Sequence, residues 1–188
     1  MFIDKDKLIN SFNELEENMK NYSLPKWEQF PDIELYMDQV ISLITKYLDI
    51  YCRAVGTEKL ITPSMINNYV KLDILPPPKK KKYSRTHLAY LIIICTLKQT
   101  LDMATIQKII PPDIDGNEVR KIYNSFVENQ HKAFVYVTEN VRELAMPAIS
   151  EETDNADAIG DLLMQVSLSA NIYKILTENI TKNAGIQI

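Results

Sequence analysis

The chain has 188 residues, of which 46% are hydrophobic and 24% are charged, and these values suit one globular domain or a compact domain with an appendage. The formal net charge of −4 is unevenly spread: residues 74–101 contain six basic and no acidic residues, which leaves −10 (−4 minus 6) for the rest. A disulfide framework is excluded because the two cysteines lie far apart in apolar runs. A membrane-spanning protein is excluded because no apolar run is long enough to cross a bilayer.

The first predicted element is a charged helix at residues 4–21. Apolar residues recur there, and in most of the sequence, at spacings of three and four, which predicts an all-α protein. No apolar signal-peptide core precedes this helix, so we expect a cytoplasmic protein. Two prolines then mark a linker, whose Trp27 and Phe30 are expected to pack on the body. A second helix is expected at residues 32–55, with Asp32 as its N-cap.

A short helix with two distinct faces is expected at residues 63–72. Thr62 is a suitable N-cap, and Pro63 occupies the first helical position, where proline is favoured. Four apolar residues of this helix fall on one side at helical spacing. The opposite, polar stripe consists of Ser64, Asn67, Asn68 and Lys71.

A basic connector follows the short helix. Three prolines at 76–78 force an extended backbone and lead directly into the four lysines at 79–82. Ser84 is expected to cap a largely buried helix that ends near residue 100, and a shorter helix is expected at residues 104–110. The connector therefore joins two helices and concentrates positive charge between them.

Two longer helices are expected at the C-terminal end, at residues 117–145 and 156–181. Pro147 and an acidic loop separate them, and such a pair forms an antiparallel hairpin. The hairpin either covers the preceding unit or serves as a dimer interface.

The order of elements in residues 62–110 resembles a known family. The stretch INNYVKLDILPPPKKKKYSRTHLAYL resembles the MerR-like winged helix-turn-helix regulators, in which a recognition helix and a Leu-Leu-Pro-Pro sequence precede a basic wing and a Tyr-Ser-x-x-x-Leu helix start. The longer chain, with LPKWEQFPDIELYMDQVI, also resembles a family of bacterial proteins that carry this unit, which implies no known activity. The matching positions are Ile66, Tyr69, Leu75, Pro76, Pro77, Tyr83, Ser84 and Leu88.

The helical spacing and the resemblance together predict an all-α fold in three segments. Residues 1–31 would form the N-terminal helix and linker, residues 32–112 the winged helix-turn-helix unit with a short basic wing, and residues 113–188 the C-terminal hairpin. The resemblance also implies a transcriptional regulator that binds double-stranded DNA as a homodimer through residues 117–182. Three residues depart from the family pattern, so no base preference is carried over: Asn67, Asn68 and Asp73.

The residue types of the short helix and the connector fit DNA chemistry independently. Asparagine bonds adenine with two hydrogen bonds, lysine reaches guanine or phosphate, and a lysine run neutralises phosphates without reading sequence. We expect four residues of the short helix to face the major groove: Ser64, Asn67, Asn68 and Lys71. We expect six further residues to contact the phosphate backbone: Lys79, Lys80, Lys81, Lys82, Arg85 and His87.

Other interpretations remain open for the same residues. A lysine run is also typical of a solvated loop, and a polar stripe is typical of the solvent face of a surface helix. The alternative function is a protein-interaction module that has a helix-turn-helix-like fold and does not bind DNA. A membrane-surface role would need an adjacent exposed apolar face. We expect no enzyme, metal or cofactor, because no nucleophile has a histidine base in context and no metal-ligand spacing occurs; a small-molecule effector is compatible with the chain but unsupported.

Overall fold

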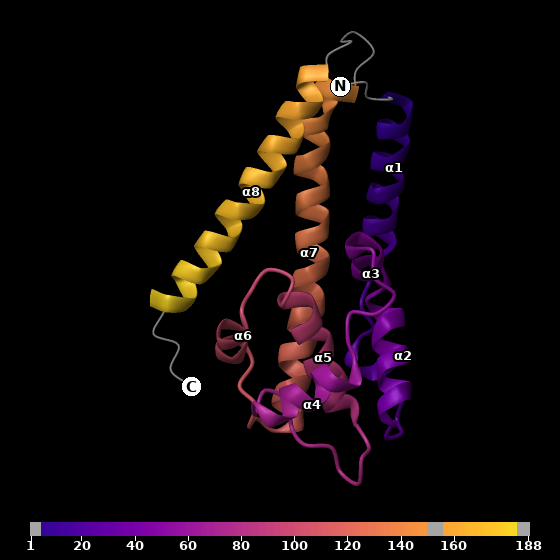
Figure 1. Ribbon diagram of the computed structural model, residues 1–188, viewed down its shortest axis with the longest axis vertical. Helices are drawn as coiled ribbons and strands as arrows, with labels where there is room; N and C mark the ends of the chain where they lie inside the picture. The colour runs from indigo at the N-terminus through magenta and orange to yellow at the C-terminus, as the bar shows by residue number, and fades with distance from the viewer. Residues whose placement is uncertain (1–4, 150–155, 184–188) are drawn as a thin grey trace. The chain divides into compact units, whose positions relative to one another are not determined.

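The computed structural model describes residues 5–149 and 156–183. Within these ranges the regular structure is all helical, with eight α-helices, one short 3-10 helix and no strand, so the all-α part of the expected fold is confirmed (Figure 1). The elements are α1 (Lys5–Asn21), η1 (Trp27–Gln29), α2 (Met37–Tyr47), α3 (Asp49–Val55), α4 (Pro63–Lys71), α5 (Arg85–Leu97), α6 (Met103–Ile109), α7 (Gly116–Ile149) and α8 (Ala156–Asn183).

The helices form two compact units. The central unit contains described residues 23–128 and 180–183, and the outer unit contains described residues 5–22 and 129–179. The linker after α1 and the first part of α7 therefore belong to the central unit. These boundaries differ from the three segments expected from the sequence.

The expected helix at residues 32–55 is wrong in its start and its continuity. The structure divides it into α2 and α3 at Leu48, and Asp32 does not cap it, because α2 begins at Met37. Leu35 and Tyr83 exchange two backbone hydrogen bonds, with N to O distances of 2.9 and 2.8 Å. This pairing holds the backbone before α2 in an extended conformation, which prevents an earlier helix start.

The expected short helix is confirmed as α4, with Thr62 as its N-cap: the Thr62 hydroxyl accepts the Met65 N–H at 3.3 Å. The helix ends in a Schellman motif, in which Ile74 N–H donates to the Tyr69 carbonyl at 2.9 Å. Asp73 adopts the left-handed conformation that this motif requires, with φ of 53°.

Helix α5 is the centre of the central unit. Every residue from His87 to Cys95 is buried, and α2 packs against both α5 and α4. The two cysteines, Cys52 and Cys95, are buried free thiols, and burial raises the pKa of Cys95 to about 12. The cysteines are therefore apolar core residues, as expected.

Aromatic contacts hold the linker to the start of α7. Phe30 is buried with its ring centroid 4.9 Å from that of Tyr123. Trp27 N–H donates to Asn124 Oδ1 at 3.2 Å, and the Tyr123 hydroxyl donates to the Pro25 carbonyl at 2.7 Å. The expected packing of Trp27 and Phe30 is confirmed, and it explains why the start of α7 belongs to the central unit.

In the outer unit, α1 packs on the second half of α7. Arg142 Nη1 lies 2.8 Å from both carboxylate oxygens of Glu16, and Lys20 Nζ lies 2.7 Å from one of them. These cations lower the pKa of Glu16 through hydrogen bonds. Helices α7 and α8 run in opposite directions (Figure 1), and Tyr136 forms a hydrogen bond with Tyr173 between them. The acidic loop predicted between the two helices lies mostly outside the described residues.

Candidate nucleic-acid interface

Helix α4 presents its polar stripe to solvent. Ile66 and Tyr69 are buried, so the helix is fixed by its apolar side. The four residues of the polar stripe are exposed, and no other described residue forms a hydrogen bond or ion pair with their side chains. They are Ser64, Asn67, Asn68 and Lys71.

Residues Lys79–Lys82 form a tight reverse turn, which we call the lysine turn. Lys82 N–H donates to the Lys79 carbonyl at 2.9 Å, and the two residues form an isolated β-bridge. The central residues Lys80 and Lys81 have φ angles of 49° and 63°, the combination required by a type I′ turn. The turn therefore has a defined backbone geometry, and its flanks do not extend into strands.

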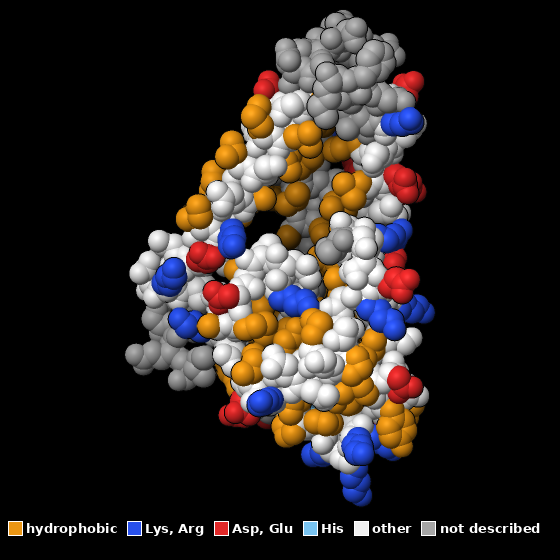
Figure 2. Space-filling view, in the orientation of Figure 1, with side chains coloured by type: hydrophobic (Ala, Val, Ile, Leu, Met, Phe, Trp, Pro, Cys, Tyr) orange, Lys and Arg blue, Asp and Glu red, His pale blue; other side chains and the backbone are white. Residues whose placement is uncertain are grey.

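The lysine turn is anchored to the core directly after Lys82. Tyr83 is buried and pairs with Leu35, and the Tyr83 ring stands edge-on to the His87 ring at 5.3 Å. Figure 2 shows Lys and Arg side chains gathered over the loop between α4 and α5, at the lower end of the view. In Figure 1 both α4 and this loop lie at that end of the central unit.

The charges of the lysine turn are not neutralised within the described part of the chain. Lys79, Lys80 and Lys81 are exposed, Lys82 is half-buried, and none of the four forms an ion pair with a described carboxylate. A cleft of about 380 Å³ beside the turn is lined by residues of both charges, which include Glu34 and Asp113 as well as Lys79 and Lys82. Acidic groups thus border the basic turn and form no ion pair with it.

Arg85 is engaged by the linker. Its guanidinium donates to the carbonyl oxygens of Phe30 and Pro31 at 3.1 and 3.2 Å, and it lies 3.4 Å from an Asp32 carboxylate oxygen. The Arg85 side chain is mostly buried, with a relative exposure of 30%. The structure therefore gives Arg85 a role in attaching the linker to α5.

His87 is part of the N-terminal cap of α5. Its Nδ1 accepts the Ser84 N–H at 3.0 Å and lies 2.9 Å from the Ser84 hydroxyl. The residue is only 6% exposed, and burial is the largest cause that lowers the pKa of His87. His87 is thus buried, whereas Arg85 keeps part of its side chain in solvent while the linker holds its guanidinium.

A family model described as "Domain of unknown function (DUF1836)" matches residues 25–126, more than half of the chain. The chain belongs to this family. The matched DUF1836 region nearly coincides with the central unit and contains both α4 and the lysine turn. No curated protein and no solved structure matches the chain.

Tyr36 belongs to the surface around the lysine turn of the DUF1836 domain, although sequence reasoning did not select it. The Lys82 ammonium lies 5.4 Å from the centroid of its ring. The neighbouring Ile33 is also exposed. No local pattern identifies Tyr36, because its position depends on the pairing of Leu35 with Tyr83, which is distant in the sequence.

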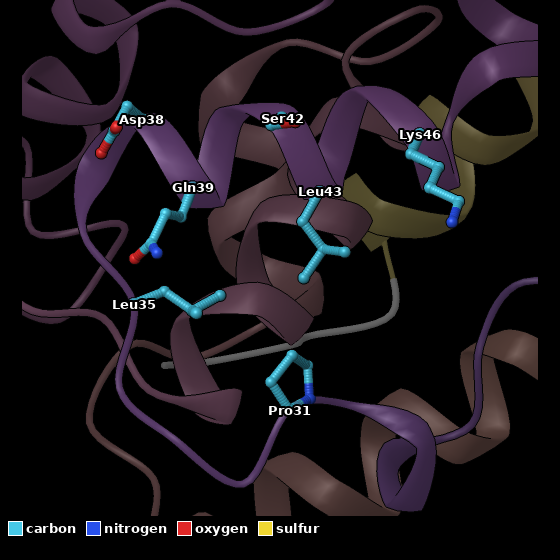
Figure 3. A pocket seen from close by; sticks show the side chains of 7 residues that line it. All are labelled: Pro31, Leu35, Asp38, Gln39, Ser42, Leu43 and Lys46. Atoms are coloured by element: carbon cyan, nitrogen blue, oxygen red, sulfur yellow. The ribbon is translucent and has the colours of Figure 1, made fainter.

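A second hollow of the DUF1836 domain runs along α2 and has a volume of about 410 Å³ (Figure 3). Leu35, Leu43 and Pro31 approach one another in its centre, while Asp38 and Lys46 lie at opposite ends of the α2 segment. The hollow contains no histidine or cysteine. Across the described residues, no group of three or more His, Cys, Asp or Glu side chains is placed to hold a metal ion. No described helix is both long enough and apolar enough to cross a membrane.

Proposed function

We propose that this chain is a cytoplasmic, sequence-specific DNA-binding transcriptional regulator. Its α4 would lie in the major groove, and its lysine turn would lie on the phosphate backbone. Two features of the same unit carry the proposal. The polar stripe of α4 is exposed and its side chains form no hydrogen bond with another described residue, and the lysine turn has a defined backbone but no ion pair with a described carboxylate. A helix that reads DNA needs such short polar side chains on a rigid apolar base.

The two parts have different roles. Asn67 and Asn68 offer the amide pairs that match adenine, and Lys71 reaches guanine or a phosphate. The lysine turn neutralises phosphates and releases counterions, so it supplies affinity and salt sensitivity but no base preference. Sequence specificity therefore depends on α4, and the position of α4 depends on its buried Ile66 and Tyr69.

The chain is proposed to act as a homodimer through α7 and α8. A two-fold dimer would bring two copies of α4 to half-sites about one turn of DNA apart. Exposed large apolar side chains on α8 support self-association, each more than half exposed: Leu163, Met164, Leu168, Ile172, Tyr173, Ile175 and Leu176.

The alternative is a protein-interaction module that does not bind DNA. The apolar surface of α8 favours a protein partner of some kind, whether a second copy or another helix. Glu34 and Asp113 lie beside the lysine turn, so this surface carries both negative and positive charge. Such a surface also fits a protein partner that carries both charges. Binding of DNA by the purified chain distinguishes the two functions.

The test is a selection of genome fragments with the purified full chain at low salt. We expect enrichment of a common sequence, and loss of most binding when Lys79, Lys80, Lys81 and Lys82 are changed to alanine. A control variant removes equal charge from exposed lysines elsewhere, at Lys26, Lys46, Lys132 and Lys174, and should still enrich the sequence. No enrichment by the unchanged chain would contradict DNA binding.

A further inference from the structure

Tyr36 lies next to the lysine turn through a specific strand-like register. Leu35 and Tyr83 are directly paired by two backbone hydrogen bonds. In an antiparallel pair, the residue after one member stands opposite the residue before the other. Tyr36 is therefore the cross-strand neighbour of Lys82, in agreement with the 5.4 Å between the ammonium and the ring centroid.

The backbone of Tyr36 is held on both sides. Its N–H donates to Gln39 Oε1 at 2.8 Å, and its carbonyl accepts the Val40 N–H at 3.0 Å in the first turn of α2. Side chains alternate along an extended segment, so Leu35 points into the core and Tyr36 points out. Tyr36 is 54% exposed as a residue, and its side chain is presented to solvent from a fixed backbone.

Lys82 differs from the other residues of the lysine turn. It is half-buried, while Lys79, Lys80 and Lys81 are exposed, and its ammonium rests over an aromatic face. A cation above a ring is attracted by the negative charge of the ring face. A lysine that is restrained in this way before binding loses less conformational freedom when it meets a phosphate.

We propose that Tyr36 is a positioning and contact residue for the nucleic-acid backbone. Its ring holds the Lys82 ammonium toward a phosphate, and its hydroxyl donates a hydrogen bond to a phosphate oxygen of the same strand. Tyrosine hydroxyls are regular donors to phosphate in protein–DNA complexes. The inference rests on the proposed function and adds an ordered, uncharged contact to the charges of the lysine turn.

The fold does not depend on the Tyr36 ring. The pairing of Leu35 with Tyr83 and the contact with Gln39 are made by backbone atoms of residues 35 and 36. Removal of an exposed ring leaves these hydrogen bonds in place, so a Tyr36 variant should fold with an unchanged unfolding midpoint. An effect on DNA affinity can then be separated from an effect on stability.

The experiment is a double-mutant cycle on Tyr36 and Lys82 in the full chain, with a duplex recovered by the selection as the ligand. We expect Tyr36→Phe to weaken binding about threefold and Tyr36→Ala about tenfold, with an unchanged salt slope. Lys82→Ala should reduce the slope by about 0.9, because one phosphate contact is lost. The double variant should lose less than the product of the two single losses, because part of the Lys82 contribution depends on the ring.

The control is Ile33→Ala, a change of an exposed side chain on the same segment, which should leave the affinity within about twofold. Unchanged affinity in Tyr36→Ala, additive losses in the cycle, or an equal loss in the Ile33 variant would overturn the assignment of Tyr36. Failure of the unchanged chain to bind any duplex would instead contradict the proposed function.

Discussion

Lys80 and Lys81 occupy backbone conformations that suit asparagine and glycine better than lysine. Both have positive φ, at 49° and 63°. A left-handed conformation is unfavourable by about 1–2 kcal/mol for a residue with a Cβ, which is why Asn-Gly is favoured in a type I′ turn. Strained residues of this kind are concentrated at functional sites. We propose that the charge of these two lysines at the tip of the turn serves DNA binding.

Replacement of Lys80→Asn together with Lys81→Gly should separate charge from strain. The free energy of unfolding should rise by about 1–2 kcal/mol in urea titrations, because the strain is relieved. DNA affinity should fall and the salt slope should decrease by about two, since two phosphate contacts are lost. The Lys80→Ala, Lys81→Ala variant should lose the same affinity without the gain in stability. Equal DNA binding by the Asn-Gly variant would show that the tip charges are not used.

His87 makes stability dependent on pH. Burial lowers its pKa below 6.5, Lys79 lowers it further, and Glu34 with the carbonyls of Pro76 and Pro77 acts in the opposite direction. Around pH 6.5 this histidine therefore binds more protons in the unfolded chain than in the folded chain. The stabilising contribution is complete above pH 6.5 and is lost as the pH falls from there toward the folded-state pKa.

Urea unfolding from pH 7.5 to 5 measures this effect. We expect the free energy of unfolding of the unchanged chain to decrease as the pH is lowered. The decrease should be smaller in His87→Gln. The exposed histidine provides the matched control, so His131→Gln should keep the pH dependence of the unchanged chain. An identical pH profile for His87→Gln and the unchanged chain would contradict the assignment to His87.

At the scale of elements, local signals predicted the helices whose starts and ends they mark. Thr62 and Pro63 identified the start of α4, and Ser84 identified the start of α5. The division of residues 32–55 could not be predicted, because the extended backbone at Leu35 is imposed by Tyr83 from a distant part of the chain. The helix starts that could be predicted were those whose capping residue is adjacent to the helix in the sequence.

The candidate site shows the same limit. The polar stripe of α4 follows from helical spacing, so Asn67 and Asn68 were predicted as exposed from the sequence. The partners of Arg85 could not be predicted, because they are backbone carbonyls of Phe30 and Pro31, which have no sequence signal. Tyr36 was missed because its neighbour Lys82 is brought close by tertiary pairing.

The end of α4 provides a prediction about one element. Asp73 has φ of 53° in the Schellman motif, a position that glycine adopts without strain. Asp73→Gly should raise the free energy of unfolding by about 0.5–1 kcal/mol, because aspartate tolerates this conformation only partly. Asp73→Ala should lower it. Urea unfolding at constant pH measures both, and a loss of stability in the glycine variant would contradict the role given to this position.

At the scale of the whole molecule, α8 is apolar on two opposite sides. Ile159 is buried and Val166 half-buried on one side, whereas Leu168 and Ile172 are exposed on the other. A helix with apolar residues around most of its circumference is expected to be covered on both sides. In the proposed dimer, a second copy of the chain would cover the second side.

Charged substitutions on this surface should separate the subunits. Leu168→Glu with Ile172→Glu should convert a dimer into a monomer in light scattering, because two carboxylates per chain would be buried without partners. Ser167→Glu with Asn171→Glu adds the same charge at exposed neighbouring positions and should leave the dimer intact. A monomeric unchanged chain at high concentration would contradict the two-half-site arrangement.

The most direct test of DNA binding is the salt dependence of affinity for a selected duplex and for a scrambled duplex. We expect alanine at all four positions of the lysine turn to reduce the slope of log affinity against log salt by about three to four. Asn67→Ala with Asn68→Ala should instead remove the preference for the selected duplex and leave the slope unchanged. Absence of binding at low salt, or a slope that is unchanged when the four lysines are replaced, would contradict DNA binding through the lysine turn.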